Sequence, residues 1–241
     1  GLTAGLGTTT LLRPLLDAVS PLEPASVAML CTMATLCAAL VTAFFALGSP
    51  LPLHPDELLL LAVGAALGGV LGDLASARFF AAMERSSAVL LQNALLFTII
   101  ALPSVYFGRL SHTLAPLRAN RLFSLPTAFA VGLLGSFLSF GAEPLTLMLY
   151  AFLFAADEEE SAIAALTVSL FAMTGKFIVL LIRQRFRLPD ADALLWLLPG
   201  AVGGSLLAML PALQGRQRGA GSALLRLSLF TSLLNIAAAL A

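Results

Sequence analysis

Long apolar segments separated by short polar stretches run through most of this chain. Six of the segments are about 20 residues long, which is the length that a helix needs to cross the hydrocarbon core of a bilayer. They cover residues 25–47, 58–77, 87–107, 161–182, 193–213 and 219–240. The pattern therefore predicts six membrane-spanning helices.

Two further apolar elements are interrupted. The first, residues 1–20, contains Arg13 and Pro14, and the second, residues 122–156, contains "GAEP" from Gly141 to Pro144. A proline inside a helix removes a backbone hydrogen bond and kinks or breaks the helix. We therefore expect each of these elements to consist of two half-helices that meet at a break.

The two interrupted elements match each other when the chain is shifted by about 130 to 135 residues. The matched positions are Gly5 with Gly135, Arg13 with Glu143, Pro14 with Pro144, and the glycine pair 68–69 with the pair 203–204. The chain thus divides into an N-terminal repeat (1–110), a linker loop (111–121) and a C-terminal repeat (122–241). Internal duplication with interrupted helices at corresponding places is the sequence signature of secondary transporters, whose site lies near the breaks.

Two orientations of the repeat are compatible with this pattern. The halves are inverted if each broken element re-enters the membrane without crossing it, and parallel if each crosses. The positive-inside rule does not separate them, because the inverted arrangement places five arginines on each side. We favour the inverted repeat, because short broken helices usually re-enter.

Composition agrees with a membrane protein. The chain has 241 residues, of which 59% are hydrophobic and 11% charged, with a mean hydropathy of +0.98; soluble domains average about 25% charged residues. The fold class is therefore all-α and integral to the membrane, and the zero net charge argues against nucleic-acid binding. Because Gly1 is not Met and already lies in an apolar element, the sequence leaves open whether residues precede it.

The breaks are the predicted binding site. A helix that restarts inside the membrane offers backbone N–H groups and the positive end of its dipole, which suit an anion. We assign hydroxyls beside both breaks, and the backbone of the second, to the site: Thr8, Thr9, Thr10, Ser136, Ser139 and Gly141. The alternative is that each hydroxyl bonds a carbonyl of its own helix.

Charged side chains in apolar segments are the second group of candidates, because intramembrane charge is expensive and usually functional. Lys176 follows Ala165, Ser169 and Ala172 at helical spacing, and could either bind an anion, pair with Glu143, or snorkel to the interface. Arg13 could bind an anion through two hydrogen bonds from its guanidinium group, and Glu143 could couple transport to protons. The alternative is that Arg13 and Glu143 form an ion pair that only neutralises their charges. Asp73 is interpreted as interfacial.

Other polar and small residues have simpler expected roles. Thr32, Thr35 and Ser169 line the pathway or pack against a neighbouring helix. Gln92, Asn93 and Asn235 are expected to hydrogen-bond between helices, and Gly64, Gly68 and Gly72 to form a close packing face. "DEEE" (157–160) is expected to begin a helix rather than to bind a metal.

The glycine and proline pattern resembles one known family. The start "GLTAGL", a proline shortly after it and a "GxxxGG" helix, all repeated once, are similar to the TauE/SafE sulfite exporters, also called TSUP. The resemblance implies a transporter in the inner membrane that moves a small sulfur-containing anion such as sulfite, sulfoacetate or thiosulfate. It implies no cofactor; the expected partners are the anion and the lipid bilayer, and a homodimer is left open.

Three other functions are alternatives to this one. A channel, or a permease for another small carboxylate or inorganic anion, would also suit a break lined with N–H groups. An intramembrane enzyme is the least favoured, because His54 and His112 both fall in loops and no HExxH pair or nucleotide-binding loop is present. We therefore predict a non-enzymatic transporter that works by alternating access.

Overall fold

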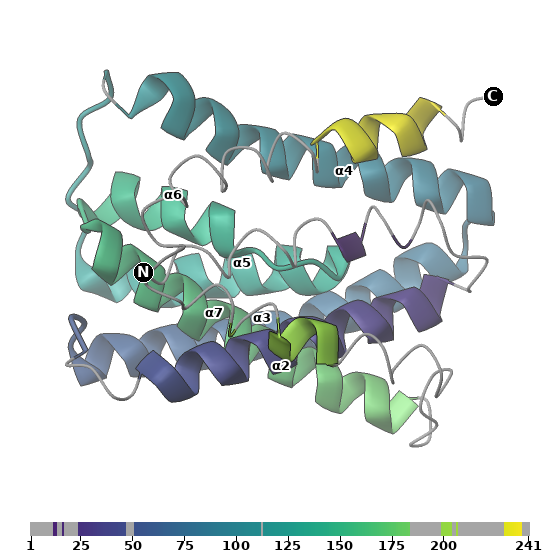
Figure 1. Cartoon of the computed structure of the whole chain (residues 1–241), viewed down its shortest axis with the longest axis horizontal. Helices are drawn as coiled ribbons and strands as arrows, with labels where there is room; N and C mark the ends of the chain where they lie inside the picture. The colour runs from purple at the N-terminus through teal and green to yellow at the C-terminus, as the bar shows by residue number, and fades with distance from the viewer. Residues whose placement is uncertain are drawn as a thin grey trace.

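The computed structural model describes residues 12–13, 16, 24–46, 51–111, 113–183, 199–203, 206 and 229–237 (Figure 1). Within these ranges the regular structure is entirely helical. The labelled helices are α2 (Pro24–Ala46), α3 (Pro55–Ala81), α4 (Arg85–Val105), α5 (Ser124–Leu138), α6 (Glu143–Phe154) and α7 (Glu158–Arg183), with short helical turns η2 (Tyr106–Leu110) and η3 (Arg121–Phe123).

Five of the described helices are long and apolar enough to cross a membrane. They are Ser26–Ala46, Pro55–Phe80, Ser87–Leu110, Arg121–Leu138 and Glu158–Arg183. Four of them confirm predicted spans, and the fifth is the first part of the interrupted run 122–156. Of the predicted spans 193–213 and 219–240, only 199–203, 206 and 229–237 are described, and these residues are helical. The chain is thus an all-α, multi-pass membrane protein.

α3 lies between α5 and α7, and glycines allow the backbones to approach closely. A Cβ atom added to Gly64 would come 2.5 Å from the carbonyl oxygen of Leu125, and one added to Gly175 of α7 would come 2.6 Å from that of Ala66. Gly69 faces the backbone of Ala172 in the same way. The predicted packing role of the α3 glycines is confirmed, and it extends to α7.

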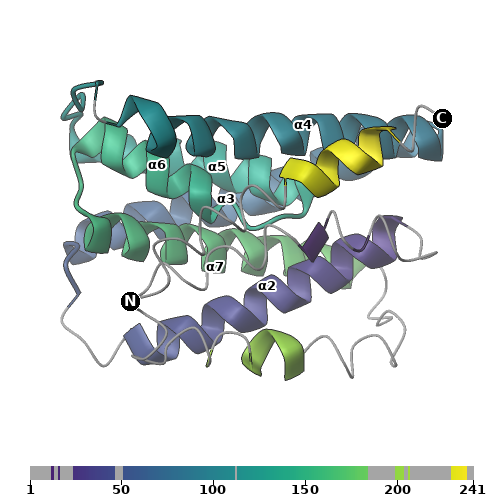
Figure 2. The ribbon, with the colours of Figure 1, turned by 45° about the horizontal axis from the view of Figure 1, so that its top comes forward.

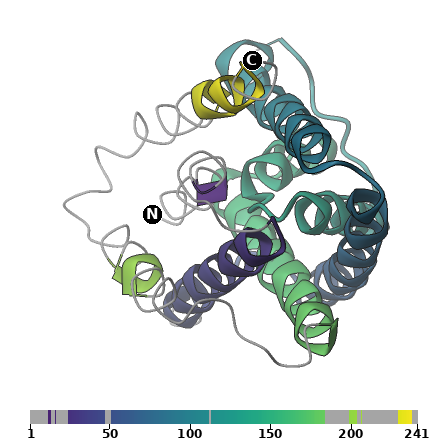
Figure 3. The same ribbon diagram turned by 90° about the vertical axis from the view of Figure 1, so that its right-hand side faces the viewer.

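α3, α5 and α7 run in the same direction. Along α3, Gly64 faces Leu125 and Gly72 faces Leu133, so α5 advances with α3. α2, α4 and α6 run the opposite way, and all six helices lie roughly along the long axis of the molecule (Figures 1 and 2). Seen along that axis, the helix at 229–237 lies against α4 (Figure 3). There Asn235 donates to Asn93 over 3.3 Å, which confirms a hydrogen bond between helices.

The predicted break in the run 122–156 is present. α5 ends at Leu138, and Ser139 adopts a left-handed conformation (φ 55°) that stops the helix. The amide of Phe140 then bonds back to the carbonyl of Gly135 over 3.0 Å, as in a Schellman motif. α6 begins at Glu143 with Pro144 in its first turn, where a missing N–H costs nothing.

Both ends of the α5–α6 element lie beside the first turn of α3. The buried carboxylate of Glu57 accepts a hydrogen bond from Ser124 Oγ at the start of α5 (3.1 Å) and one from Tyr150 Oη near the end of α6 (3.2 Å). The loop before α5 also donates to the last carbonyls of α6, from Leu117 N to Phe152 O over 2.8 Å. The chain therefore enters and leaves this element at one end of the bundle.

α7 begins as the acidic run "DEEE" predicts. The amide of Glu160 donates to Asp157 Oδ1 over 2.8 Å, and the amide of Asp157 donates to Glu160 Oε2 over 3.3 Å. This reciprocal pair is a capping box, which satisfies two N–H groups that a helix start leaves without partners. The acidic residues therefore have a local structural role.

Candidate functional site

Lys176 is the centre of the site at the break. It is the chain's single lysine, and its side chain is 1% exposed, so it does not snorkel to the interface. The other members of its stripe, Ala165, Ser169 and Ala172, are buried as well. Ser169 and Lys176 therefore project from one buried face of α7 towards the α5–α6 break.

Lys176 and Arg13 both donate to the end of α5. Lys176 Nζ bonds the carbonyl oxygen of Ser136 and, over 2.8 Å, Ser139 Oγ. Arg13 Nη1 donates to the carbonyl oxygen of Leu138 over 2.9 Å, and Arg13 is 2% exposed. A helix C-terminus carries orphan carbonyls and partial negative charge, which cations stabilise. Two buried cations from different elements thus converge on one broken helix end.

Asp73 is the ion-pair partner of Lys176, a contact that the sequence did not indicate. It is 3% exposed, and Lys176 Nζ lies 3.2 Å from its Oδ1. Its position at the membrane interface stays a prediction. Its second oxygen lies 3.1 Å from Nη1 of Arg183, whose side chain is 44% exposed. The available sequence signal was the spacing of Gly69 and Asp73, which puts the carboxylate on the glycine face of α3.

The other side of the break carries a carboxylate. Glu143 opens α6 and is 5% exposed, and its Oε1 accepts a hydrogen bond from Ser169 Oγ over 2.6 Å. A carboxylate in the first turn favours the positive end of the helix dipole. Ser169, predicted to line the pathway, is therefore in direct contact with the residue predicted to couple protons.

The remaining predicted residues have different outcomes. Ser136 is buried and its Oγ donates to the carbonyl oxygen of Gly69 over 2.6 Å, so it ties α5 to α3 at the break. Gly141 is buried within the break itself. The hydroxyls of Thr32 and Thr35 donate to carbonyls one turn earlier in α2, over 2.7 and 2.8 Å, and both residues are buried, so their predicted place along the pathway or in a helix contact stays a prediction. Thr8, Thr9 and Thr10 lie outside the described residues.

Among the described residues, the charges at the break nearly balance. Arg13, Lys176 and Arg183 supply three cations, and Asp73 and Glu143 supply two carboxylates. An anion that enters such a cluster can replace one of the carboxylates as the ion-pair partner of a cation.

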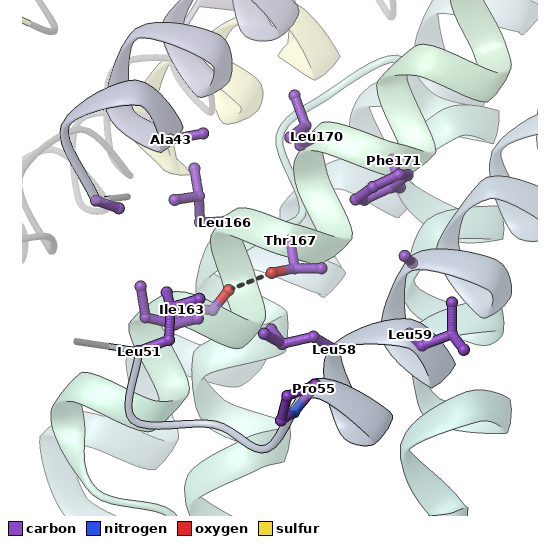
Figure 4. A pocket seen from close by; sticks show the side chains of 12 residues that line it. Ala43, Leu51, Pro55, Leu58, Leu59, Ile163, Leu166, Thr167, Leu170 and Phe171 are labelled. Carbon is purple, nitrogen blue, oxygen red and sulfur yellow. Dashed lines mark hydrogen bonds between the residues drawn. The ribbon is translucent and has the colours of Figure 1, made fainter. Parts of the chain in front are cut away.

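A cavity of about 420 Å³ lies elsewhere, between α2 and the first halves of α3 and α7 (Figure 4). Its lining is apolar, with Leu58, Leu166 and Phe171 among the side chains that face it. The one hydroxyl there, that of Thr167, donates to the carbonyl oxygen of Ile163 over 2.8 Å. Its apolar walls do not suit an anion.

Sequence reasoning missed a second polar cluster, at Glu57. Glu57 is 4% exposed, and Arg121 Nη1 lies 3.4 Å from its Oε2, in addition to the bonds from Ser124 and Tyr150. An acid in the first turn of a helix is ordinarily solvated, so its position gave no signal. Only the fold brings the start of α5 and the end of α6 to it.

Comparison with protein families, with curated proteins and with solved structures finds no match. What the fold and the site define is a class: a multi-pass helical membrane protein with a buried, charged break in one of its helical elements.

Proposed function

We propose that the chain is a secondary transporter that moves a small anion by alternating access, with the site at the α5–α6 break. The observation that carries the proposal is the convergence of Lys176 and Arg13, both buried, on the end of α5. Lys176 binds the anion and Arg13 contributes a second positive charge. The backbone at the start of α6 completes the pocket.

The free-energy cost of placing charge in a membrane favours a binding function for this cluster. A charged side chain at the centre of a bilayer costs at least about 2.5–3.5 kcal/mol on insertion scales, so charged groups buried in apolar spans usually have a function. Neutral hydroxyl and amide groups can satisfy a broken helix end without that cost, as happens elsewhere in membrane helices. Buried cations at a break therefore favour ligand binding over simple backbone satisfaction.

The proposal includes an inverted repeat with a re-entrant element in each half. It is supported by the α5–α6 element, both ends of which are held at Glu57. It is also supported by contacts between matched spans: α2 packs against α7, and Asn93 of α4 meets Asn235. A two-fold axis through the centre of the molecule would bring these equivalent helices together.

The substrate class rests on the resemblance to the TauE/SafE exporters, which points to sulfite, sulfoacetate, thiosulfate or a related organosulfonate. The site chemistry is compatible with that class. An ammonium and a guanidinium bind oxyanions through charge-assisted hydrogen bonds, and the hydroxyl of Ser139 lies beside the ammonium. The membrane is proposed to be the bacterial inner membrane on the same ground.

The experiment is uptake of ³⁵S-thiosulfate into proteoliposomes that contain the purified protein. Lys176→Met removes the central ammonium and keeps the bulk of the side chain, so uptake should fall by about tenfold or more, the value of one charge-assisted hydrogen bond. Thr167→Val is the matched control, because it lies on the same helix and its hydroxyl is satisfied within that helix. Its uptake should equal that of the wild type.

Two results would contradict the proposal. Wild-type protein that transports neither thiosulfate nor sulfite nor sulfoacetate would reject the substrate class. Wild-type uptake by Lys176→Met would reject the site. Preloading the vesicles with unlabelled thiosulfate separates a transporter from a channel, because alternating access predicts faster entry of label by exchange.

A further inference from the structure

Asp73 holds a position that the proposed function does not yet use. Its carboxylate lies between two cations, Lys176 at 3.2 Å and Arg183 at 3.1 Å. Lys176 is the group that the proposal assigns to the anion. The carboxylate and an incoming anion would therefore compete for one ammonium.

We propose that Asp73 is an internal substitute for the substrate, and that it takes up a proton when the anion displaces it from Lys176. This inference rests on the proposed function and supplies its coupling. In the empty site Asp73 forms ion pairs with both cations. When the anion takes Lys176, Asp73 loses one cation and gains a neighbouring negative charge, both of which favour the protonated carboxyl group.

The charges around Asp73 are compatible with this exchange. Lys176 and Arg183 of α7 both contact it, and the α5 residues that pack on the preceding Gly72, Leu133 and Ser136, carry no charge. Arg78 of its own helix is exposed.

Access to protons comes from the same ion pair. The side chain of Arg183 is 44% exposed and belongs to the last turn of α7. Asp73 thus pairs with a partly exposed arginine at the end of the apolar span, and the inference assigns the entry of the proton to this side of the site. The proton balances one negative charge of the anion, so that one proton moves with each anion bound.

A proton count on binding tests this directly. Thiosulfate keeps its charge between about pH 6 and about pH 8, so any proton taken up on binding belongs to the protein. Isothermal titration of the detergent-purified protein with thiosulfate, repeated in buffers of different ionisation enthalpy, measures that uptake. The wild type should take up about one proton per anion at the pH where binding is strongest.

Asp73→Asn should bind thiosulfate without proton uptake, and in proteoliposomes it should lose the stimulation by an inward proton gradient, which in the wild type should be at least about fivefold. Glu57→Gln is the matched control, because Glu57 is an equally buried carboxylate on the same helix, α3, but lies in its first turn, away from the break. It should keep both the proton count and the stimulation.

If Asp73→Asn does not fold, Arg183→Gln provides a second test of the same proton uptake. With one cation fewer beside Asp73, the pH at which the proton is taken up should move upward. An unchanged pH profile of proton uptake in Arg183→Gln would overturn the inference. So would a proton count that stays at the wild-type value in Asp73→Asn. Loss of proton uptake in Glu143→Gln alone would also overturn it.

The two proposals can fail separately. Wild-type protein that binds no thiosulfate, sulfite or sulfoacetate would reject the proposed function, and the inference with it. Binding that Lys176→Met abolishes but that never takes up a proton would leave the anion site in place and reject the role of Asp73.

Discussion

Ser139 and Ala155 end their helices in the left-handed backbone conformation, with φ of 55° and 54°. An L-residue with a Cβ atom pays roughly 1–2 kcal/mol there, whereas glycine does not. The two positions differ in what the side chain does. Ser139 Oγ accepts a hydrogen bond from Lys176, and Ala155 has only a methyl group.

Ala155→Gly should therefore raise the free energy of unfolding by about 1 kcal/mol. The measurement is SDS-induced unfolding in mixed micelles, followed by far-UV circular dichroism. Ser139→Gly gains the same backbone relief but removes the hydroxyl beside Lys176, so its stability should increase less and its anion uptake should fall. Equal behaviour of the two variants would mean that the Ser139 hydroxyl contributes nothing.

At the scale of single residues, the sequence indicated the helix face of a side chain better than it indicated the residues that the side chain contacts. The spacing of Ser169 and Lys176 correctly placed both on one helix face, which the structure shows to be buried, and Pro144 correctly marked the start of a half-helix. The sequence did not identify Asp73 as the partner of Lys176, because the two are more than one hundred residues apart. Pairing across helices depends on rotation and register, which hydropathy does not record.

At the scale of elements, glycine determines how closely α3 approaches its neighbours. A Cβ atom at Gly69 would overlap the backbone oxygen of Ala172, which cannot rotate away as a side chain could. Gly108, in η2, has no atom within 4 Å of the same hypothetical Cβ. A comparison of alanine substitutions at Gly69 and Gly108 therefore separates the effect of close packing on stability from the effect of helix propensity.

Gly69→Ala should lower the free energy of unfolding by about 1–3 kcal/mol, because overpacking forces α3 and α7 apart. Alanine is itself a better helix former than glycine by about 1 kcal/mol, so Gly108→Ala should be neutral or stabilising. The same SDS titration measures both variants. Loss of stability at Gly108 as large as that at Gly69 would refute the packing argument.

The ends of the α5–α6 element depend on Glu57. Tyr150→Phe removes the hydroxyl that donates to this carboxylate while leaving the ring in place, so we expect a loss of about 1 kcal/mol. Tyr106→Phe is the control, since the Tyr106 ring packs on Phe107 and Phe152 but its hydroxyl makes no hydrogen bond among the described residues. SDS titration of both variants checks the difference, and equal losses would contradict it.

The break in the interrupted element was predicted from particular residues, whereas the return of its second half was favoured only because short broken helices usually re-enter. Gly141 and Pro144 announce a break in the sequence, whereas the return of α6 to the start of α5 depends on contacts such as that of Tyr150 with Glu57. Local signals therefore identified where the helix stops. Tertiary contacts determined where the chain then goes.

At the scale of the whole molecule, the proposed two-fold relation brings equivalent helices into contact where they lie beside the axis. α2 and α7 do so through packing, and α4 meets the helix at 229–237 through a polar contact. Asn93 and Asn235 are 142 residues apart and lie in different halves of the proposed repeat. Their interaction is therefore a measure of how the halves hold together.

A double-mutant cycle on Asn93 and Asn235 tests that connection. Interhelical hydrogen bonds in a membrane contribute about 0.6 kcal/mol on average and rarely more than about 1.7 kcal/mol, so the coupling between Asn93→Ala and Asn235→Ala should fall in that range. Thr98 is the matched partner for a control cycle, because it also lies on α4 and its hydroxyl donates to the carbonyl of Ala94 within that helix. Asn235→Ala combined with Thr98→Val should be additive to within about 0.5 kcal/mol. Additivity in both cycles would show that this amide pair does not join the halves, and packing alone would then have to hold α4 against the last helix.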